Sequence, residues 1–132
     1  MTEINIRTTE HCQFVNIDRH VQRAVDEAKV KDGVCVVFVP HTTAGITINE
    51  NADPDVVADM KTALNRVVPW DAGYAHAEGN AAAHVKACMM GFSQQVLVKS
   101  GRIQLGTWQS VYFCEFDGPR SRKVWIQCLR SE

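Results

Sequence analysis

The run Val34-Cys35-Val36-Val37-Phe38-Val39 constrains the fold more than any other part of the chain. Four of its six residues are valines, and β-branched residues favour strands. Because apolar residues do not alternate with polar ones here, the run predicts a strand buried on both faces. It is far too short to span a membrane. Pro40 ends the strand, which places His41 just past a strand end, where polar groups can project into a crevice.

Three helices are predicted from apolar residues at helical spacing and from helix start signals. The first begins with Asp18 as N-cap and stops at residues 31–33. Its expected buried stripe is Val21, Ala24, Val25 and Ala28. The second begins at Asp53-Pro54, since Asp is a favoured N-cap and proline suits the first helical position. Its expected buried stripe is Val56, Val57, Met60, Leu64 and Val67. A long loop over residues 68–79 precedes a short helix over residues 81–90.

Strand patterns fill the rest of the chain. They cover residues 3–17 with a polar break, 45–49, 95–98, 103–116 and 124–129. Strands and helices do not alternate strictly as they do in a doubly wound sheet. We therefore predict an α+β fold with mainly antiparallel strands and about three helices packed outside. A chain of 132 residues has the size of one domain, residues 1–132, and needs no metal or disulfide to stabilise its core.

Bulk charge predicts neither nucleic-acid nor membrane binding. The 14 basic and 15 acidic residues leave a net charge of -1. The late cluster of Arg120, Arg122, Lys123 and Arg130 is either a solvated face or a phosphate site. The five cysteines lie far apart without a C-x-x-C pair, which indicates reduced core thiols. The first five residues have neither a basic nor an apolar signal region, so we expect a cytoplasmic protein.

Two polar clusters are candidates for the two halves of one pocket. The first is His41-Thr42-Thr43 together with Asn49-Glu50-Asn51, on either side of a strand pattern. The second is His76-Ala77-Glu78-Gly79-Asn80, followed by His84. Histidines are zinc ligands and acid–base groups, but the spacing of His41, His76 and His84 matches no short zinc signature. The fold must therefore bring them together for a metal site, and otherwise each is a half-buried histidine that caps a loop.

The other polar residues of these motifs have a structural and a functional interpretation. Glu50 and Glu78 are candidates for a metal ligand, a partner that orients an imidazole, or a general base. Asn49, Asn51 and Asn80 suit ligand binding as well as turns and helix caps. If Asn80 is an N-cap, the helix that follows aims its N-terminus at the site, which suits phosphate.

A glycine breaks the long strand pattern at Leu105-Gly106-Thr107-Trp108-Gln109. Such a glycine often marks a bulge or a close approach of a ligand. Trp108 offers a stacking plane and Gln109 an amide, although a tryptophan is also a common core residue. The sequence has no nucleophile elbow, phosphate-binding loop or dinucleotide glycine pattern.

Taken in order, these motifs resemble the YjbQ family, also called UPF0047. The similarity covers residues 41–54, the His76-x-Glu78-Gly79-Asn80-x-x-x-His84 pattern, residues 105–109 and the segment 115–120. It implies an α+β fold with a β-sandwich-like core, a homotrimer, and a pocket near the subunit boundary lined by the histidine and Asn-Glu-Asn motifs. It also implies a secondary thiamine-phosphate synthase activity, which joins hydroxymethylpyrimidine diphosphate to thiazole phosphate and releases diphosphate.

This resemblance leads to a hypothesis for the role of each candidate residue. The catalytic residues are His41, Glu50 and Glu78, and the ligands of a divalent metal, zinc or magnesium, are His41, His76 and His84. The substrate- and phosphate-binding residues are Thr42, Asn49, Asn51, Asn80, Trp108, Gln109, Arg120 and Arg122. Two alternatives stay open: a metal-dependent hydrolase or lyase acting on a small phosphorylated metabolite, and a non-catalytic trimeric protein that binds a small anion.

Overall fold

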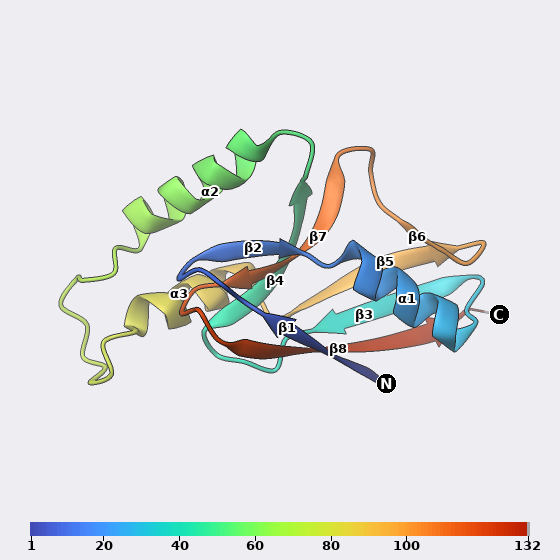
Figure 1. Ribbon diagram of the computed structural model, residues 1–132, viewed down its shortest axis with the longest axis horizontal. Coiled ribbons are helices and arrows are strands. Elements are labelled where there is room, and N and C mark those ends of the chain that lie inside the picture. The colour runs from blue at the N-terminus through green and yellow to red at the C-terminus, as the bar shows by residue number, and fades with distance from the viewer. Residues whose placement is uncertain (132) are drawn as a thin grey trace.

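The computed structural model describes residues 1–131, which form three helices and eight strands (Figure 1). The helices are α1 (Asp18–Ala28), α2 (Pro54–Val67) and α3 (Ala81–Met90). The strands are β1 (Thr2–Arg7), β2 (Gln13–Asn16), β3 (Gly33–Phe38), β4 (Ala44–Glu50), β5 (Ser93–Lys99), β6 (Arg102–Gln104), β7 (Gln109–Glu115) and β8 (Ser121–Arg130). No helix among these residues combines the length and the apolar character that a membrane crossing requires.

The strands form two antiparallel sheets. The larger sheet has the order β1-β8-β3-β5-β6, and the smaller has the order β2-β7-β4. The last strand of the chain, β8, therefore lies between β1 and β3. Three helices and antiparallel sheets confirm the predicted α+β class.

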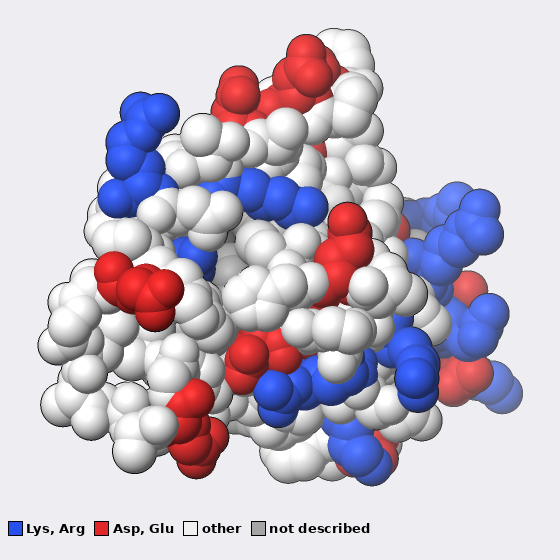
Figure 2. Space-filling view, turned by 60° about the vertical axis from the view of Figure 1, so that its left-hand side comes forward, with Lys and Arg blue, Asp and Glu red and all other residues white. Residues whose placement is uncertain are grey.

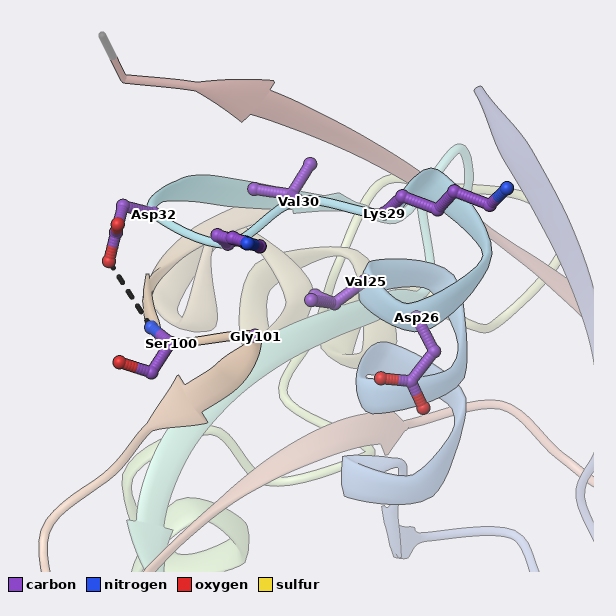
Figure 3. Close-up of a pocket in the computed structure, with 8 residues that line it drawn as sticks. Val25, Asp26, Lys29, Val30, Asp32, Ser100 and Gly101 are labelled. Carbon is purple, nitrogen blue, oxygen red and sulfur yellow. Dashed lines mark hydrogen bonds between the residues drawn. The ribbon is translucent and has the colours of Figure 1, made fainter.

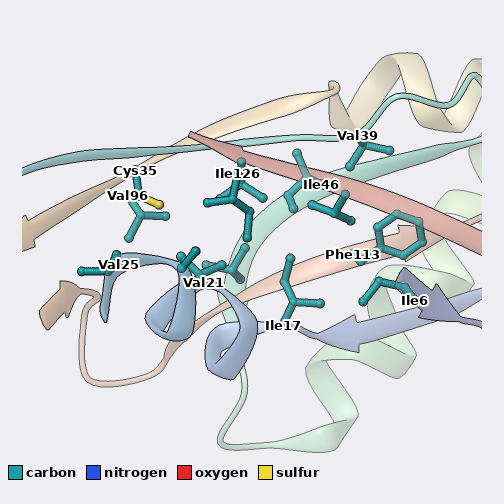
Figure 4. Packing of buried hydrophobic residues seen from close by; sticks show 14 of the residues in the cluster. Ile6, Ile17, Val21, Val25, Cys35, Val39, Ile46, Val96, Phe113 and Ile126 are labelled. Atoms are coloured by element: carbon teal, nitrogen blue, oxygen red, sulfur yellow. The ribbon is translucent and has the colours of Figure 1, made fainter. Parts of the chain in front are cut away.

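The main core lies between the inner faces of the two sheets and α1, so the core is sandwich-like (Figure 4). Ile17, Val21 and Val25 enter it from α1 and the residue before it. The sheets contribute, among others, Ile6, Cys35, Val37, Ile46, Val96, Phe113 and Ile126. A second, smaller cluster forms where α3 covers the other face of the small sheet, and its buried members are Ala83, Ala87, Tyr112, Cys114 and Phe116.

The prediction that β3 is buried on both faces is wrong for the single chain. Cys35 and Val37 are buried, whereas Phe38 on the opposite face is 40% exposed. The reason is that β3 belongs to an antiparallel sheet, which needs a core on only one side. The other side carries an outer apolar face, which consists of Val34, Val36, Phe38, Leu97, Trp125 and Leu129.

Two details of the helix predictions are also wrong. Ile17, not Asp18, occupies the N-cap of α1, and the Asp18 carboxylate instead accepts a hydrogen bond from the backbone N–H of Val111 at 2.7 Å. Ala28 is exposed. Asp53 does cap α2, because its carboxylate accepts from the N–H of Asp55 at 2.9 Å. However, no residue of α2 is fully buried, since α2 stands away from the sheets and only one side of it reaches the smaller core cluster (Figure 1).

The limits of α3 match the prediction, and a glycine lets the helix approach the small sheet closely. A Cβ atom on Gly45 would lie 2.8 Å from the carbonyl oxygen of Gly91 and 2.9 Å from Cβ of Met90. The N–H of Ile46 donates to the same Gly91 oxygen at 3.1 Å. This contact fixes α3 against β4 and thereby sets the position of the N-terminal end of α3.

The long strand predicted over residues 103–116 is in fact two strands, β6 and β7, because the chain leaves the sheet at the glycine break around Gly106. All five cysteines are free. Cys35 and Cys114 are buried, but Cys88 is exposed on α3, so its assignment to the core is wrong. Sγ of Cys35 lies 3.1 Å from Sγ of Cys128 across the β3–β8 pair.

Candidate functional site

A polar pocket of about 430 Å³ lies where β3 ends and β8 begins. Three separate segments line it: the chain after β3, the end of the long loop with the start of α3, and the start of β8. The lining residues are Pro40, His41, Thr42, Thr43, His76, Glu78, Asn80, His84, Arg120 and Arg122. The structure thus brings the first histidine motif and the second polar cluster to one cavity.

His41 is held in one tautomer by the neighbouring strand. Its Nε2 accepts a hydrogen bond from the backbone N–H of Lys123 at 2.8 Å. The ring proton therefore sits on Nδ1, which becomes a donor. Burial, together with the positive charge of Arg122, lowers the pKa of His41 below its ordinary value. His41 is consequently a neutral hydrogen-bond donor in the wall of the pocket.

Arg122 is fixed by a buried ion pair with Glu115. Its Nε donates to Oε1 of Glu115 at 2.8 Å, and its Nη2 donates to Oε2 of Glu115 and, at 2.8 Å, to Oγ1 of Thr43. Thr8 Oγ1 and the N–H of Asp117 complete the four donors to the Glu115 carboxylate, at 2.8 and 3.0 Å. Burial raises the pKa of Glu115, but Arg122 and the other donors outweigh it, so the pKa is lowered. Within residues 1–131, Nη1 of Arg122 has no hydrogen-bond partner, which leaves it for a pocket ligand.

Asp117 connects Arg120 to Asn80. Nη2 of Arg120 and Nδ2 of Asn80 both donate to Oδ2 of Asp117, each at 2.9 Å. Asn80 occupies the N-cap position of α3 but makes no side-chain cap bond, because its amide is used in this contact. Its Oδ1 is buried without a hydrogen-bond partner. Since the carboxylate can only accept, the amide cannot turn its oxygen toward Asp117.

The second cluster contributes a pair of imidazoles. The rings of His76 and His84 lie nearly perpendicular, at 87°, with centroids 5.3 Å apart. His76 is exposed on the loop, and His84 is half-buried on α3. Nowhere in residues 1–131 do three or more His, Cys, Asp or Glu side chains form a group placed to hold a metal ion. The three-histidine metal site therefore stays a prediction, and Nε2 of His41 is already engaged.

The Asn-Glu-Asn motif lies away from this pocket. His41 precedes β4 and Glu50 ends it, and seven residues of extended strand span roughly 20 Å. The side chain of Asn49 accepts from the N–H of Glu50 at 2.7 Å, as in a turn. Asn51 lines a separate cavity of about 290 Å³, where it accepts from the hydroxyl of Tyr112 at 2.8 Å.

Trp108 and Gln109 also lie outside the histidine pocket. Trp108 is 62% exposed in the loop between β6 and β7. The side chain of Gln109 closes that loop by accepting from the N–H of Gly106 at 2.8 Å. Neither residue contributes to the pocket of a single chain.

The sequence analysis did not identify the residues that hold the two arginines in place. Thr8, Glu115 and Asp117 do not line the pocket, yet they position the groups that do. Glu115 had a detectable signal, because it is the only charged residue in the apolar run over residues 110–116. A charge at such a position is seldom fully buried unless it is paired.

A larger cavity lies elsewhere, at the C-terminal end of α1 (Figure 3). It measures about 600 Å³ and lies between α1 and the β5–β6 turn. Asp32 accepts there from the N–H of Ser100 at 3.2 Å. Its lining contains neither histidine nor arginine, so the smaller polar pocket is the better candidate for chemistry.

Two antiparallel sheets around one core, with a polar pocket at the ends of β3 and β8, define an α+β protein with a sandwich-like core. Solved structures share this fold over nearly the whole chain. A YjbQ/UPF0047-family protein of Clostridium acetobutylicum superposes with a TM-score of 0.96 at 53% identity, covering 98% of this chain and 100% of that one. A conserved hypothetical protein of Thermus thermophilus gives 0.91 at 39% identity, with coverage of 98% and 100%.

Sequence comparison identifies the family. The family described as "UPF0047 protein YjbQ-like" matches residues 2–131. UPF0047 protein YugU of Bacillus subtilis is 48% identical, with 96% of each chain covered. UPF0047 protein MJ1081 of Methanocaldococcus jannaschii is 46% identical, with 94% of this chain and 90% of that one covered. The chain belongs to the YjbQ-like UPF0047 family, which confirms the resemblance found in its motifs.

Proposed function

We propose that the polar pocket binds the phosphate of a small phosphorylated molecule, and that the protein has a secondary thiamine-phosphate synthase activity. The observation that carries the proposal is the convergence of Arg120, Arg122 and His41 on one cavity. Its volume of about 430 Å³ is in the range of small-molecule sites. A cytoplasmic location agrees with five free thiols.

The proposed reaction needs stabilisation of a leaving diphosphate. The thiazole nitrogen attacks the methylene carbon of hydroxymethylpyrimidine diphosphate, a C–N bond forms, and the C–O bond breaks so that diphosphate leaves with the electron pair. Donors that already point at the developing negative charge lower the barrier. Nη1 of Arg122, the guanidinium of Arg120 and Nδ1–H of His41 are the donors that this chain offers.

A divalent metal, zinc or magnesium, is part of this proposal. His76 and His84 are the residues that would hold it, because their rings lie 5.3 Å apart at the pocket wall. Glu78 lies on the same wall as a carboxylate candidate for a ligand or a base. When bound, the metal would supply further charge neutralisation for the diphosphate.

We also propose a homotrimer as the functional unit. The outer apolar face leaves Leu97 63% and Leu129 55% exposed, and a neighbouring subunit would cover it. The resemblance implies a pocket near the subunit boundary that includes the Asn-Glu-Asn motif. Since Glu50 lies far from His41 within one chain, a catalytic role for Glu50 requires that a neighbouring subunit supplies it.

The test is release of diphosphate from the two thiamine precursors by the purified protein. Removing one donor to the developing charge should slow release by on the order of 100-fold, in His41→Ala and in Arg120→Ala. Arg23→Ala, on the exposed side of α1, is the matched control outside the pocket and should leave the rate unchanged. Equal rates in all three variants would exclude the pocket from the reaction.

The His76–His84 pair also favours a second candidate, a metal-dependent hydrolase or lyase acting on a small phosphorylated metabolite. Metal analysis distinguishes this candidate from the simple anion-binding protein. A metal-dependent enzyme should retain about one zinc per chain after purification and lose it in His84→Ala. An anion-binding protein should retain none and still bind phosphate.

A further inference from the structure

Two of the five cysteines face each other across neighbouring strands. Cys35 of β3 and Cys128 of β8 are direct register partners, and their Sγ atoms lie 3.1 Å apart. Residues that lie opposite each other in antiparallel strands have Cα atoms about 4.5–5.5 Å apart. This separation falls within the range of about 4.4–6.8 Å that disulfides span, so oxidation requires no large movement of the backbone. The reduced protein therefore already holds both sulfur atoms in place for a disulfide.

The two thiols differ in how accessible they are. Cys35 is fully buried in the main core, between Val96 of β5 and Cys128. Cys128 packs at the margin of the same core and is only half-buried. Burial, together with the hydrogen bond to Cys128, raises the pKa of Cys35, so Cys35 remains a protonated thiol. A small oxidant from solution consequently reaches Cys128 before it reaches Cys35.

The other three cysteines are placed differently. Within residues 1–131, none of them forms a sulfur–sulfur hydrogen bond. Sγ of Cys114 is buried and donates to the backbone oxygen of Tyr112 at 3.7 Å. Cys12 is half-buried, and Cys88 is exposed on α3. Cys88 is thus more accessible than Cys128 but has no thiol in contact, which makes it an internal control for the reaction of an isolated thiol.

We infer that Cys35 and Cys128 are a reversible oxidation site, at which a peroxide converts the two thiols into a disulfide between β3 and β8. The thiolate of Cys128 attacks one oxygen of hydrogen peroxide, the O–O bond breaks, and a sulfenic acid and a hydroxide form. The sulfur of Cys35 then attacks the sulfenic sulfur, the S–O bond breaks, and the proton of Cys35 leaves with the hydroxide as water. The two thiols are oxidised and the peroxide is reduced to water. A thiol in solution reverses the reaction by exchange.

A peroxide suits this site better than a charged oxidant. Hydrogen peroxide is small and uncharged, which favours its approach to a half-buried thiol. The chain has a net charge of -1, and acidic and basic side chains are interspersed on the side of the molecule in Figure 2, so no large field of one sign attracts a charged oxidant there. Disulfides of cytoplasmic proteins are usually transient and sense oxidants, which agrees with the location proposed above.

The disulfide would join most of the chain into one covalent loop. The two cysteines are 93 positions apart in a chain of 132 residues. A cross-link over such a long loop removes many conformations from the unfolded chain and thereby stabilises the folded protein. We expect the oxidised protein to unfold on the order of 10 °C above the reduced one. A midpoint no higher than that of the reduced protein would contradict this stabilising effect.

The test is mild oxidation of the folded protein, followed by alkylation of the remaining thiols and peptide mapping. The reduced wild type is treated with equimolar hydrogen peroxide, quenched with catalase and alkylated in denaturant. We expect a peptide pair that links Cys35 to Cys128, faster migration in a denaturing gel without reductant, and loss of both after addition of dithiothreitol. Cys88→Ser should form the same link to the same extent, because it removes only an exposed thiol on α3.

Single variants separate the roles of the two cysteines. Cys35→Ala should stop at the sulfenic acid of Cys128, which dimedone captures, whereas Cys128→Ala should leave Cys35 alkylatable. Thermal unfolding verifies that each variant retains the fold, and the wild type alone still decides the question if one does not.

The result that would overturn the inference is a wild type in which Cys88 is oxidised while Cys35 and Cys128 both remain alkylatable. A disulfide that joins either of them preferentially to a different cysteine would overturn it equally. Both results would leave Cys35 and Cys128 as packing residues of the core, which is the ordinary role of buried thiols.

Discussion

Glu115 sits in an otherwise apolar strand, and its carboxylate, fully buried, accepts four hydrogen bonds. A charge without these partners would be very costly to bury. The hydroxyl of Thr8 comes from the residue after β1 and the guanidinium of Arg122 comes from β8, so the group joins segments that are distant in sequence. Sequence alone could flag Glu115 as unusual, but only the strand register shows which residues neutralise it.

Removing the Glu115 carboxylate should strongly destabilise the protein. Glu115→Ala leaves the buried Arg122 charge without a partner, which typically costs about 3–5 kcal/mol of unfolding free energy. Urea unfolding followed by circular dichroism measures the loss. Glu3→Ala, which breaks an exposed pair with Lys123, is the matched control and should cost far less. Similar losses for the two variants would contradict a structural role for the buried pair.

The environment of His41 should lower the pKa of its imidazole. Because burial and Arg122 lower its pKa, the ring should titrate below the ordinary histidine value of about 6.5. As the pH falls, the unfolded chain takes up this proton before the folded protein does. The contribution of the neutral ring to the free energy of unfolding is therefore complete above a pH of about 6.5 and is lost as the pH falls toward the lower pKa of the folded protein. Nitrogen-15 NMR of the imidazole gives both the midpoint and the tautomer. A proton on Nε2 at neutral pH would contradict the hydrogen bond from Lys123.

Among the elements, α2 and α3 show what periodicity can and cannot predict. The limits of α3 and the Asp53 cap of α2 follow from local sequence, because caps and stop signals act over a few residues. The apolar stripe of α2 indicated a buried helix, yet Val67 is 69% exposed. An apolar stripe is buried only if another part of the protein packs against it, and within a single chain little packs against α2.

The contact between β4 and α3 should not tolerate a side chain at Gly45. In Gly45→Ala the new Cβ would lie 2.8 Å from a backbone oxygen of Gly91, so strand and helix must move apart. Overpacking of this kind typically costs about 1–3 kcal/mol. Thermal unfolding measures the shift. Gly106→Ala is the control, because its nearest neighbour is the end of the flexible Gln109 side chain at 3.2 Å, and a larger loss there than at Gly45 would refute the close packing.

For the whole molecule, the sequence predicted the fold class and, of the first polar cluster, the part at residues 41–43 that meets the second cluster. It did not predict that β4 carries the Asn-Glu-Asn motif away from His41, since both motifs flank the same strand and only the strand's extended length separates them. It also did not predict the one-sided burial of β3. In both cases the physical cause is the geometry of the sheets. A sequence motif gives the order of residues along the chain but not the distances and faces that this geometry sets.

The outer apolar face gives a prediction for assembly. Leu97 and Leu129 lie on either side of Val34 in neighbouring strands. If this face joins subunits of a trimer, the double variant Leu97→Glu and Leu129→Glu should sediment as a monomer, because it places charges in an apolar interface. Arg23→Glu, on the exposed side of α1, should sediment like the wild type. An unchanged sedimentation coefficient in the double variant would place the subunit contact elsewhere.

The position of β8 has a consequence for biosynthesis. This strand follows β1 and β3 along the chain and so leaves the ribosome after them, yet it pairs with β1 on one side and β3 on the other. Until it emerges, β1 has no strand partner within residues 1–131 and β3 has an open edge. A nascent or truncated chain that lacks residues 121–130 therefore exposes two strands with open edges that can aggregate, and chaperones that hold such edges should matter most until β8 has emerged.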